Sequence, residues 1–379
     1  MTPYLAVFIA LWGAFFISSV LGEIEIPLEV FAITLFVVFA GQRFETGNDW
    51  LTYRDHFIAI QQFGFSGGDS PQFPAFEPLY ILTVWLFGRV FDFQAFLLFV
   101  SVFNGLVLYR FAKTWNVSVC GLAAINYSWT YLATQMATTR YSLAMSFILL
   151  AFIFLIQHRK FVAYALVIVA AGFHFFSLAF LPVVLLINRK LTVRLAASVL
   201  IAGFLIVHVT LFAVSSGWFN GLPFSEKLVF YLDEATVKQI SAGSVGYIVL
   251  NLAFLVWVLC SQEDDDKMRL VKWSVFYLLF FQIVAWMLPV FWNRIQVFTV
   301  VVQACLLSRY MVERCDPVFL LTIAVLSFAT LMKLLVDPAF ISYVPYQSYW
   351  VNKVMMNAVR DDGESRFYQA IDRNRERAH

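Results

Sequence analysis

The sequence predicts an all-α, multi-pass integral membrane protein, and three features of its composition support that fold class. Hydrophobic residues make up 61% of the 379 positions and aromatic residues 18%, with 42 phenylalanines among them. Charged residues make up only 13%, whereas a soluble globular chain carries roughly 25%. A soluble chain of this length must cover its surface with polar groups, and this one has too few. Most of the chain is therefore expected to lie in lipid.

Long apolar stretches predict the membrane helices, because about 20 apolar residues cross a 30 Å hydrocarbon core. The segment 161–187 has basic residues on both flanks, so the positive-inside rule makes it a hairpin of short helices, 161–172 and 174–187. The first span has no basic segment before it and is expected to be retained rather than cleaved. About twelve helices result; the other spans are expected at 4–21, 27–41, 94–112, 117–137, 141–157, 191–214, 244–260, 273–290, 295–308 and 318–336.

Lysine and arginine in the short loops assign the two sides of the membrane. The segment 77–91 is too short to span and contains Arg89, so we expect it to lie in or dip into the outer interface. The whole chain, 1–379, is expected to form one membrane domain with a large outer loop at about 42–93. The other segments expected outside are the corner at 138–140, the loops 215–243 and 291–294, and the tail after 336.

Charge and motifs exclude several functions. The net charge of +2 provides no basic field, so nucleic acid is not an expected partner. The chain lacks the glycine-rich and nucleophile motifs GxxxxGK[ST], GxGxxG and GxSxG. We therefore do not expect its substrate to be a cytoplasmic nucleotide sugar. No cysteine or histidine spacing indicates a metal site, so neither a metal nor a cofactor is expected.

The most polar long segment, 41–76, lies in the expected outer loop. Gly47 and Asn48 mark a turn, and Asp49 precedes the helix WLTYRDHFIAIQQF at a position suited to an N-cap. Whether Asp49 only caps the helix or acts as a functional acid stays open. The helix should lie on the membrane surface with one apolar side. That side comprises Trp50, Tyr53, Phe57 and Ile60, while Arg54, Asp55 and Gln61 are expected in water.

Arginines gather at the expected outer ends of the helices. Any one of them could be an interfacial arginine whose charge snorkels to water. However, several share one predicted side, where their planar forks suit a phosphate group. A lipid-linked phosphate or diphosphate, approached within the bilayer, is therefore the expected ligand. The outer arginines are Arg43, Arg54, Arg89, Arg140 and Arg294, and the shared side favours Arg43, Arg140 and Arg294.

Two further residues are candidates for acid–base chemistry. His174 lies at the turn of the apolar hairpin, on the side of the arginines; the alternative is a buried histidine bonded to a backbone carbonyl. Glu77 precedes Pro78, which suits an acid at a helix start, but an outer-face acid can also act as a general base. His56, His158 and His208 receive no assigned role.

Short segments in a characteristic order resemble the bacterial polysaccharide polymerases of the Wzy/EpsG type. The resemblance is best over about residues 40–185. Tyr141 departs from the family, which often has glutamine after the arginine. The matching segments are RFETGNDWLTYRDHF from Arg43, Glu77-Pro78-Leu79-Tyr80, TTRYSLAMSF around Arg140, AAGFHFFSLAF around His174, the late Arg294, and Pro345-Tyr346.

The resemblance implies a GT-C-like glycosyltransferase of the bacterial inner membrane. It would join undecaprenyl-diphosphate-linked oligosaccharide repeats at the outer face, without a metal and with inversion at the anomeric carbon. A chain-length regulator and a flippase are the further partners considered. The implied diphosphate ligands are Arg43, Arg140 and Arg294; Asp49 is the first choice of base, before Glu77 and His174; Tyr53, Arg54 and Tyr80 complete the substrate contacts.

Two other functions remain open on the sequence. A different lipid-linked glycosyltransferase or ligase would add one sugar or pass a finished glycan to another acceptor. A transporter or flippase would move a lipid-linked glycan without changing it; no clear internal repeat, which many transporters contain, is present. The products that form would distinguish these functions from a polymerase.

Overall fold

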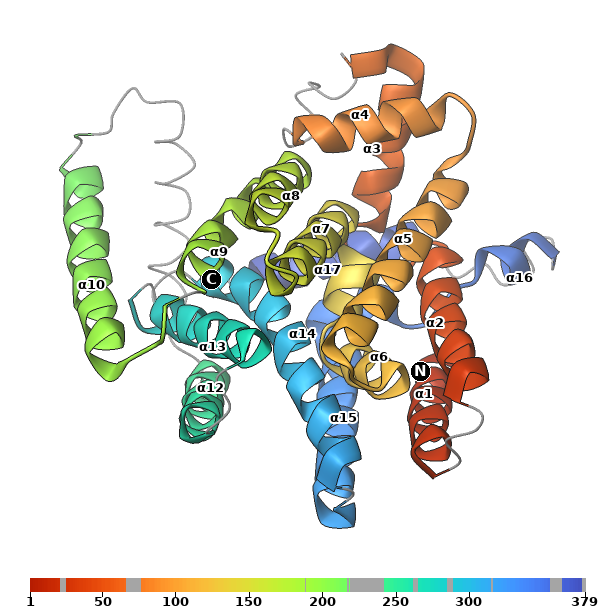
Figure 1. The fold of residues 1–379 in the computed structure, drawn as a ribbon. Coiled ribbons are helices and arrows are strands. Elements are labelled where there is room, and N and C mark those ends of the chain that lie inside the picture. Colours follow the sequence, from red (N-terminus) through yellow and green to blue (C-terminus); the bar gives the residue numbers. More distant parts are fainter. Residues whose placement is uncertain are drawn as a thin grey trace. The chain divides into compact units, whose positions relative to one another are not determined.

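The structure is a computed structural model that describes residues 1–20, 25–65, 76–187, 189–216, 218, 242–261, 265–284, 289–314, 316–354 and 363–376. These residues form helices joined by short connections, and no strand occurs among them (Figure 1). An isolated antiparallel bridge joins Arg43 to Ser348. The predicted all-α class is therefore confirmed for the described part of the chain.

The chain divides into two compact units. The first comprises residues 1–181 and 304–377, and the second comprises residues 182–303 with the last two positions. Helix α14 (Pro289–Arg314) contributes residues to both units. A single membrane domain over 1–379 remains a prediction.

Helices of the first unit follow the predicted spans closely. A π-helix, η3, and a short 3-10 helix, η4, interrupt the regular helices at two places where candidate site residues follow. The elements are α1 (Thr2–Val20), α2 (Glu25–Gly41), α3 (Trp50–Phe63), α4 (Pro78–Gly88), α5 (Phe93–Trp115), α6 (Val119–Trp129), η3 (Leu132–Ala137), α7 (Thr139–Ile156), α8 (Lys160–Phe173), η4 (Phe175–Phe180), α15 (Pro317–Val336), η5 (Pro338–Tyr343), α16 (Tyr349–Val354) and α17 (Gly363–Glu376).

The second unit contains α9 (Leu181–Leu186), α10 (Val193–Ser215), α12 (Ala242–Cys260), α13 (Asp266–Val284) and the first part of α14. Polar side chains buried among its apolar helices satisfy one another. Asn251 donates to Gln282 at 3.2 Å and accepts from Gln303 at 3.0 Å. Such interhelical bonds are the usual solution for amides at membrane depth.

Five described helices are long and apolar enough to cross a membrane: α1, α5, α7, residues 292–313 within α14, and α15. Several other apolar helices are shorter, among them α4, which has 11 residues. The 11 residues of α4 agree with an interfacial position for 77–91, which stays a prediction. The total of about twelve spans stays a prediction.

Side-chain caps explain where some of these helices begin. The Asp92 carboxylate accepts from the Ala95 N–H at 2.8 Å at the start of α5. Asp316 accepts from the Val318 N–H at 2.9 Å at the start of α15, where Pro317 occupies the first helical position. Each carboxylate satisfies a donor that the helix leaves unpaired.

Helices of the first unit are held together by buried polar contacts as well as apolar packing. Asn104 of α5 donates to Gln135 of the π-helix at 2.8 Å, and it accepts from Ser146 of α7 at 2.6 Å. At the other end of α5, Lys113 pairs with the buried Glu29 of α2 at 2.6 Å. Because lipid offers no hydrogen bonds, such pairs fix which helices adjoin.

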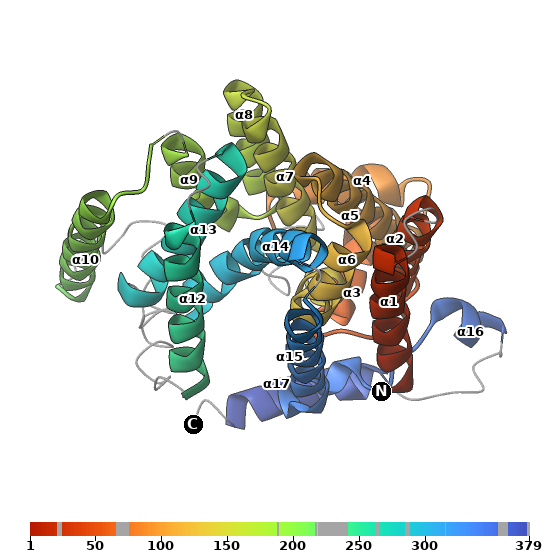
Figure 2. The same cartoon turned by 60° about the horizontal axis from the view of Figure 1, so that its bottom comes forward.

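The predicted outer segments meet at one end of the first unit. Here α2 ends, α5 and α7 begin, and the chain after α15 folds back onto the loop that follows α2. The Phe44 N–H donates to the Gln347 carbonyl at 2.9 Å, and the Tyr349 N–H donates to the Gln42 carbonyl at 2.7 Å. Figure 2 shows α17 crossing the end of α15 near the N-terminus of α1. The tail and the 42–49 loop thus lie together, a contact that the sequence did not predict.

Candidate functional site

An ion pair between Glu77 and Arg140 is the centre of one cluster at this end. Glu77 stands just before α4, and Arg140 is in the first turn of α7. Their atoms Oε2 and Nη1 are 2.5 Å apart, with side chains 17% and 18% exposed. The other carboxylate oxygen of Glu77 accepts from the Phe175 N–H at 3.2 Å. The position of Glu77 before Pro78 suggests that it caps α4, but its side chain makes no capping hydrogen bond. Instead, Glu77 joins the start of α4 to α7 and η4.

Aromatic rings enclose this ion pair. The Arg140 guanidinium lies 4.0 Å from the centre of the Phe76 ring, and its Nε donates to the Tyr53 hydroxyl at 3.4 Å. Burial raises the pKa of Tyr53 to about 12, although Arg140 acts in the opposite direction. Tyr53 is thus a neutral phenol at ordinary pH. The Tyr80 ring packs edge-on against Tyr53 at 5.8 Å.

His56 also belongs to this cluster, although the sequence assigned it no role. It is fully buried, with its ring 4.0 Å from Phe76 and 6.0 Å from Tyr80. Burial, together with the positive charge of Arg140, lowers the pKa of His56 to about 4. It follows Tyr53 by three positions, which places both on one helical face. That spacing could have revealed His56 as a member of the buried face of α3.

His174 lies next to the same ion pair. It ends α8 in an extended conformation, directly before Phe175, whose N–H binds Glu77. Its ring is 5.3 Å from that of Tyr141, the neighbour of Arg140, and only 8% of the residue is exposed. The predicted break of the hairpin at 172–174 is confirmed. Just before this break, Gly172 packs against Leu79, where a Cβ atom would come within 2.4 Å of the leucine side chain.

Arg43 forms the centre of a second cluster in the first unit. It is 2% exposed, and its Nη1 donates to the Ala40 carbonyl at 2.8 Å. Burial lowers the pKa of Arg43, although the tyrosines around it act in the opposite direction. Its Nε has no hydrogen-bond partner, and no carboxylate pairs with Arg43, within the described ranges. The surrounding tyrosines are Tyr4, Tyr131, Tyr343 and Tyr346.

The C-terminal segment completes the Arg43 cluster. The Tyr4 hydroxyl donates to the Tyr343 carbonyl at 2.6 Å, and the Tyr343 hydroxyl donates to the Leu132 carbonyl in the π-helix at 3.1 Å. Gly47 packs beside the π-helix with a φ of 113°, where a Cβ atom would come within 2.2 Å of the Met136 carbonyl oxygen. Only glycine fits this approach. Sequence alone did not predict that residues 338–348 would enclose Arg43.

Asp49 and Tyr80 connect the two clusters. Asp49 precedes α3, but its side chain makes no capping hydrogen bond. Burial is the main reason that the pKa of Tyr343, beside Arg43, and that of Tyr53, beside Arg140, are raised. The negative charge of Asp49 raises both pKa values further. The charges of Arg140 and Arg43 both act on the buried Tyr80 hydroxyl, which has no hydrogen-bond partner among the residues described.

Arg54, Arg89 and Arg294 are the remaining arginines of the predicted outer set. Arg54 pairs with Asp55 at 2.8 Å and lies 5.4 Å from the centre of the Trp50 ring. Arg89 lies 3.7 Å from the centre of the Trp85 ring and is exposed, as expected of an interfacial arginine. Arg294 lies in α14 within the second unit and is partly buried. Its predicted convergence with Arg43 and Arg140 stays a prediction.

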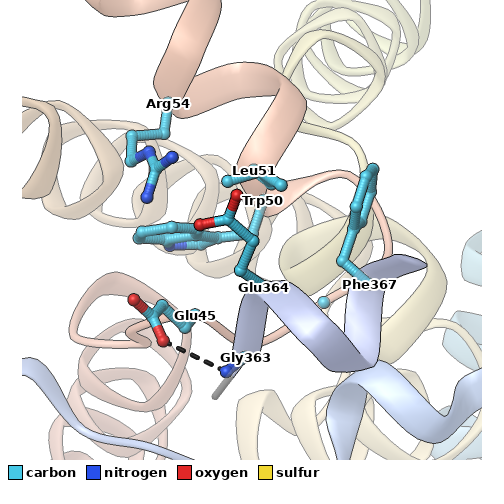
Figure 3. A pocket seen from close by; sticks show the side chains of 8 residues that line it. Glu45, Trp50, Leu51, Arg54, Gly363, Glu364 and Phe367 are labelled. Carbon is cyan, nitrogen blue, oxygen red and sulfur yellow. Dashed lines mark hydrogen bonds between the residues drawn. The ribbon is translucent and has the colours of Figure 1, made fainter. Parts of the chain in front are cut away.

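A small pocket separates Arg54 from the C-terminal helix. Figure 3 shows the side chains of Glu45, Trp50 and Arg54 facing the start of α17, where the Gly363 N–H donates to Glu45 at 3.2 Å. Arg366 of α17 also binds the Glu45 carbonyl at 3.2 Å. The room inside, about 10 Å³, is what a single water molecule requires. This pocket is therefore a packed contact that holds α17 in place, too small for a sugar.

Comparison with known proteins gives one match. The model of the EpsG family, which comprises exopolysaccharide and O-antigen polymerase-like proteins, matches residues 28–348. No curated protein and no solved structure matches the chain. The matched range begins within α2, includes both clusters except for Tyr4, and ends at Ser348, the partner of Arg43 in the isolated bridge. Since this range covers most of the 379 residues, the chain belongs to the EpsG family.

Proposed function

We propose that the protein is a polysaccharide polymerase of the bacterial inner membrane. It joins undecaprenyl-diphosphate-linked oligosaccharide repeats at the outer face, in a GT-C-like architecture of about twelve spans. The observation that carries the proposal is Arg43, a buried cation with no carboxylate partner in the described part of an EpsG-family chain. Five helices able to cross a membrane support its membrane setting.

Arg43 is suited to bind a diphosphate because its charge is desolvated and uncompensated. A buried charge costs free energy unless a partner of opposite charge is present. A diphosphate would supply that charge and accept hydrogen bonds from the guanidinium fork. The phenols around Arg43 are neutral and do not compete as anions; each donates its hydroxyl proton to a backbone carbonyl. Burial also strengthens the attraction, since little water remains to screen it.

The reaction joins two substrates through one bond exchange. A hydroxyl of the acceptor repeat attacks the anomeric carbon at the reducing end of the donor repeat. The bond from that carbon to the diphosphate oxygen breaks, and polyprenyl diphosphate leaves with the bonding electrons. Cations fixed where this charge grows stabilise the transition state. Arg43 and Arg140 are the proposed donors, with Arg294 as a third. Direct displacement inverts the anomeric configuration and requires no metal ion.

Asp49 is the proposed base that receives the proton of the acceptor hydroxyl. It lies between the cluster of Arg43 and that of Arg140, and its side chain is not used as a cap. Glu77 already accepts two hydrogen bonds, from Arg140 and from the Phe175 N–H. Its contacts favour holding Arg140 in position. His174, next to Phe175, is the remaining candidate for proton transfer.

Two tyrosines extend the proposed site toward the substrate. The Tyr80 hydroxyl is buried between both arginine charges, so it could donate a hydrogen bond to a phosphate oxygen. The Tyr53 hydroxyl accepts from Arg140 and is close to Asp49, which suits contact with a sugar hydroxyl. Arg54 is proposed to contact the glycan beyond them, from the outer surface of α3.

The decisive experiment is elongation by the purified protein. The protein, in lipid nanodiscs, is combined with a defined undecaprenyl-diphosphate-linked oligosaccharide, and the products are separated by mass spectrometry. We expect a ladder of products that differ by one repeat, and we expect it to form in the presence of EDTA as well. NMR spectra of the products should show an inverted anomeric configuration at the new linkages. Arg43→Gln should abolish the ladder, whereas Arg89→Gln, at an exposed arginine, should leave it intact. Absence of elongation by the unaltered protein would refute the proposal.

The products also separate the alternative functions. A single added sugar, or transfer to a different final acceptor, would identify another glycosyltransferase or a ligase. Movement of the intact lipid-linked glycan across a vesicle membrane, with no new linkage, would identify a transporter. No contact described here favours either alternative over polymerisation.

A further inference from the structure

A groove lies at the site end of the first unit, beside Arg43 but separate from its cluster. Its walls are the end of α2, the start of α5, and α16. The groove holds about 280 Å³, close to the lower limit of about 300 Å³ for small-molecule sites. This is far more than the water-sized pocket of Figure 3. Figures 1 and 2 both show α16 beside α2.

One wall of the groove is apolar. Val38 of α2 and Leu98 of α5 line it, together with the small residues Gly41 and Ala95. Leu98 packs directly against Gly41, where a Cβ atom would come within 2.7 Å of its side chain. Beyond Leu98 the apolar surface continues along α5 with Val102 and Leu106. These three residues are 38%, 39% and 59% exposed and follow at intervals of four, so they form one stripe on the helix. The stripe leads from the groove along a helix long enough to cross the membrane.

The opposite rim is polar and aromatic. Lys353 and Trp350 of α16 line it; Trp350 is 61% exposed, as is typical of tryptophan at a membrane–water interface. The side-chain amides of Gln42 and Gln94 complete the rim. Asp92 also lines the groove, but its carboxylate already caps α5. The groove thus pairs an apolar wall with a cationic rim, which suits an amphiphile with an anionic head.

The groove and Arg43 lie on adjacent positions at the end of α2. Gln42 lines the groove, while Arg43 is buried among the tyrosines. Both residues continue the last turn of the helix, where the Gln42 N–H donates to the Val38 carbonyl at 3.0 Å and the Arg43 N–H to the Ala40 carbonyl at 3.4 Å. The C-terminal segment pairs with both: Arg43 bridges Ser348, and the Tyr349 N–H donates to the Gln42 carbonyl. A lipid in the groove would therefore have its head group next to Arg43, the residue proposed to bind the diphosphate.

We propose that this groove binds the first isoprene units of the polyprenyl chain of the lipid-linked substrate. Lys353 and the glutamine amides face its phosphates, and the chain continues into the bilayer along Leu98, Val102 and Leu106. A free sugar would not match the apolar wall, and a soluble anion would not require it. The proposal rests on the proposed function, because that function identifies the amphiphile as a polyprenyl diphosphate.

The test uses the full-length protein in nanodiscs and a photoreactive farnesyl diphosphate as the probe. After irradiation, peptides carrying the probe are identified by mass spectrometry. We expect labelling on residues 38–42, 92–98 or 349–353. Leu98→Trp, which fills the groove, should reduce labelling at least tenfold. Leu321→Trp, at an exposed leucine of α15 that does not line the groove, is the matched control and should leave labelling unchanged.

A second variant tests the rim without disturbing packing. Lys353 is exposed, so Lys353→Glu should fold normally and weaken probe binding about fivefold to tenfold. Equal loss of labelling with excess phosphatidylglycerol and with unlabelled farnesyl diphosphate would indicate a general lipid site and overturn the proposal. Normal labelling of Leu98→Trp would also overturn it.

The outcomes distinguish this proposal from the proposed function. If the protein elongates glycans while Leu98→Trp keeps the same KM for the lipid-linked donor, the polymerase stands and the groove proposal fails. If the probe labels the groove specifically but no glycan is elongated, the groove stands and the polymerase proposal fails. When both hold, Leu98→Trp should raise the KM for the donor at least fivefold with kcat little changed.

Discussion

Glu77 and Arg140 are 63 positions apart, yet their side chains form an ion pair at 2.5 Å with less than one fifth of each exposed. Their contact joins the loop before α4 to the first turn of α7. Glu77 also binds the Phe175 N–H, so three segments depend on one carboxylate. This geometry makes the pair both a structural tie and part of the proposed site.

The tie should be measurable as an interaction free energy. Removing one partner leaves the other charge poorly compensated, which costs about 1–3 kcal/mol or more. We therefore expect Arg140→Met and Glu77→Met each to lower the free energy of unfolding, and the double variant to lose less than the sum. Denaturant titrations in detergent would complete the cycle. If the losses of the two single variants add up to that of the double variant, the interaction between Glu77 and Arg140 does not stabilise the fold.

Arg43 should behave in the opposite way. Its charge is buried without a carboxylate partner among the described residues, so Arg43→Met should keep or raise the melting temperature. The same change should reduce the elongation rate by at least about 10²-fold, a loss typical of removing one donor to a developing anion. Thermal unfolding and product ladders measure the two effects. A large fall in melting temperature would instead make Arg43 a structural residue.

Asp49→Asn separates a base from a cap. Asparagine caps helices as well as aspartate does, so folding should be unaffected even if the cap forms in solution. Loss of the carboxylate should lower kcat by about 10²–10⁴-fold, the contribution of general base catalysis. Asp55→Asn, on the same helix and paired with Arg54, is the matched control. Equal activity of both variants would exclude Asp49 as the base.

His56 should make the stability depend on pH in a defined interval. Its pKa is about 4 in the fold and about 6.5 when unfolded, so the unfolded chain binds more protons between these values. The stabilisation is complete above about pH 6.5 and is lost as the pH falls toward 4. A difference of this size corresponds to about 3 kcal/mol. Between pH 6.5 and pH 4, the melting temperature of His56→Leu should fall less than that of the unaltered protein. The melting temperature of His208→Gln, at an exposed histidine, should fall as much as that of the unaltered protein.

The close approach of Gly172 to Leu79 offers a test of the fold itself. A Cβ atom at 172 would meet the Leu79 side chain at 2.4 Å, so Gly172→Ala should destabilise the protein by about 1–3 kcal/mol, as overpacking does. Leu79→Ala should restore stability to the double variant, because it removes the clashing atoms. Thermal unfolding of the two single variants and the double variant measures this. Failure of Leu79→Ala to restore stability would place the strain elsewhere.

Much of the helical framework could be predicted from the sequence. Long apolar runs in the sequence placed α1, α2, α5, α7 and α15 close to their observed bounds. These signals are local and strong, because each helix satisfies its own backbone in lipid. The same reasoning placed the break near His174 and recognised that α4 is too short to span.

The candidate site was predictable only in its parts. The sequence by itself determined which arginines and acids were unusual in so apolar a chain; that Arg43, Asp49, Glu77 and Arg140 share the outer side of the membrane stays a prediction. Only the tertiary structure decided that Glu77 pairs with Arg140, that His56 is buried beside them, and that residues 338–348 enclose Arg43. Partner choice depends on how helices distant in sequence pack, and on close approaches such as that of Gly47 to Met136. Local residue patterns determine where the helices form, whereas contacts between helices determine which charged residues pair.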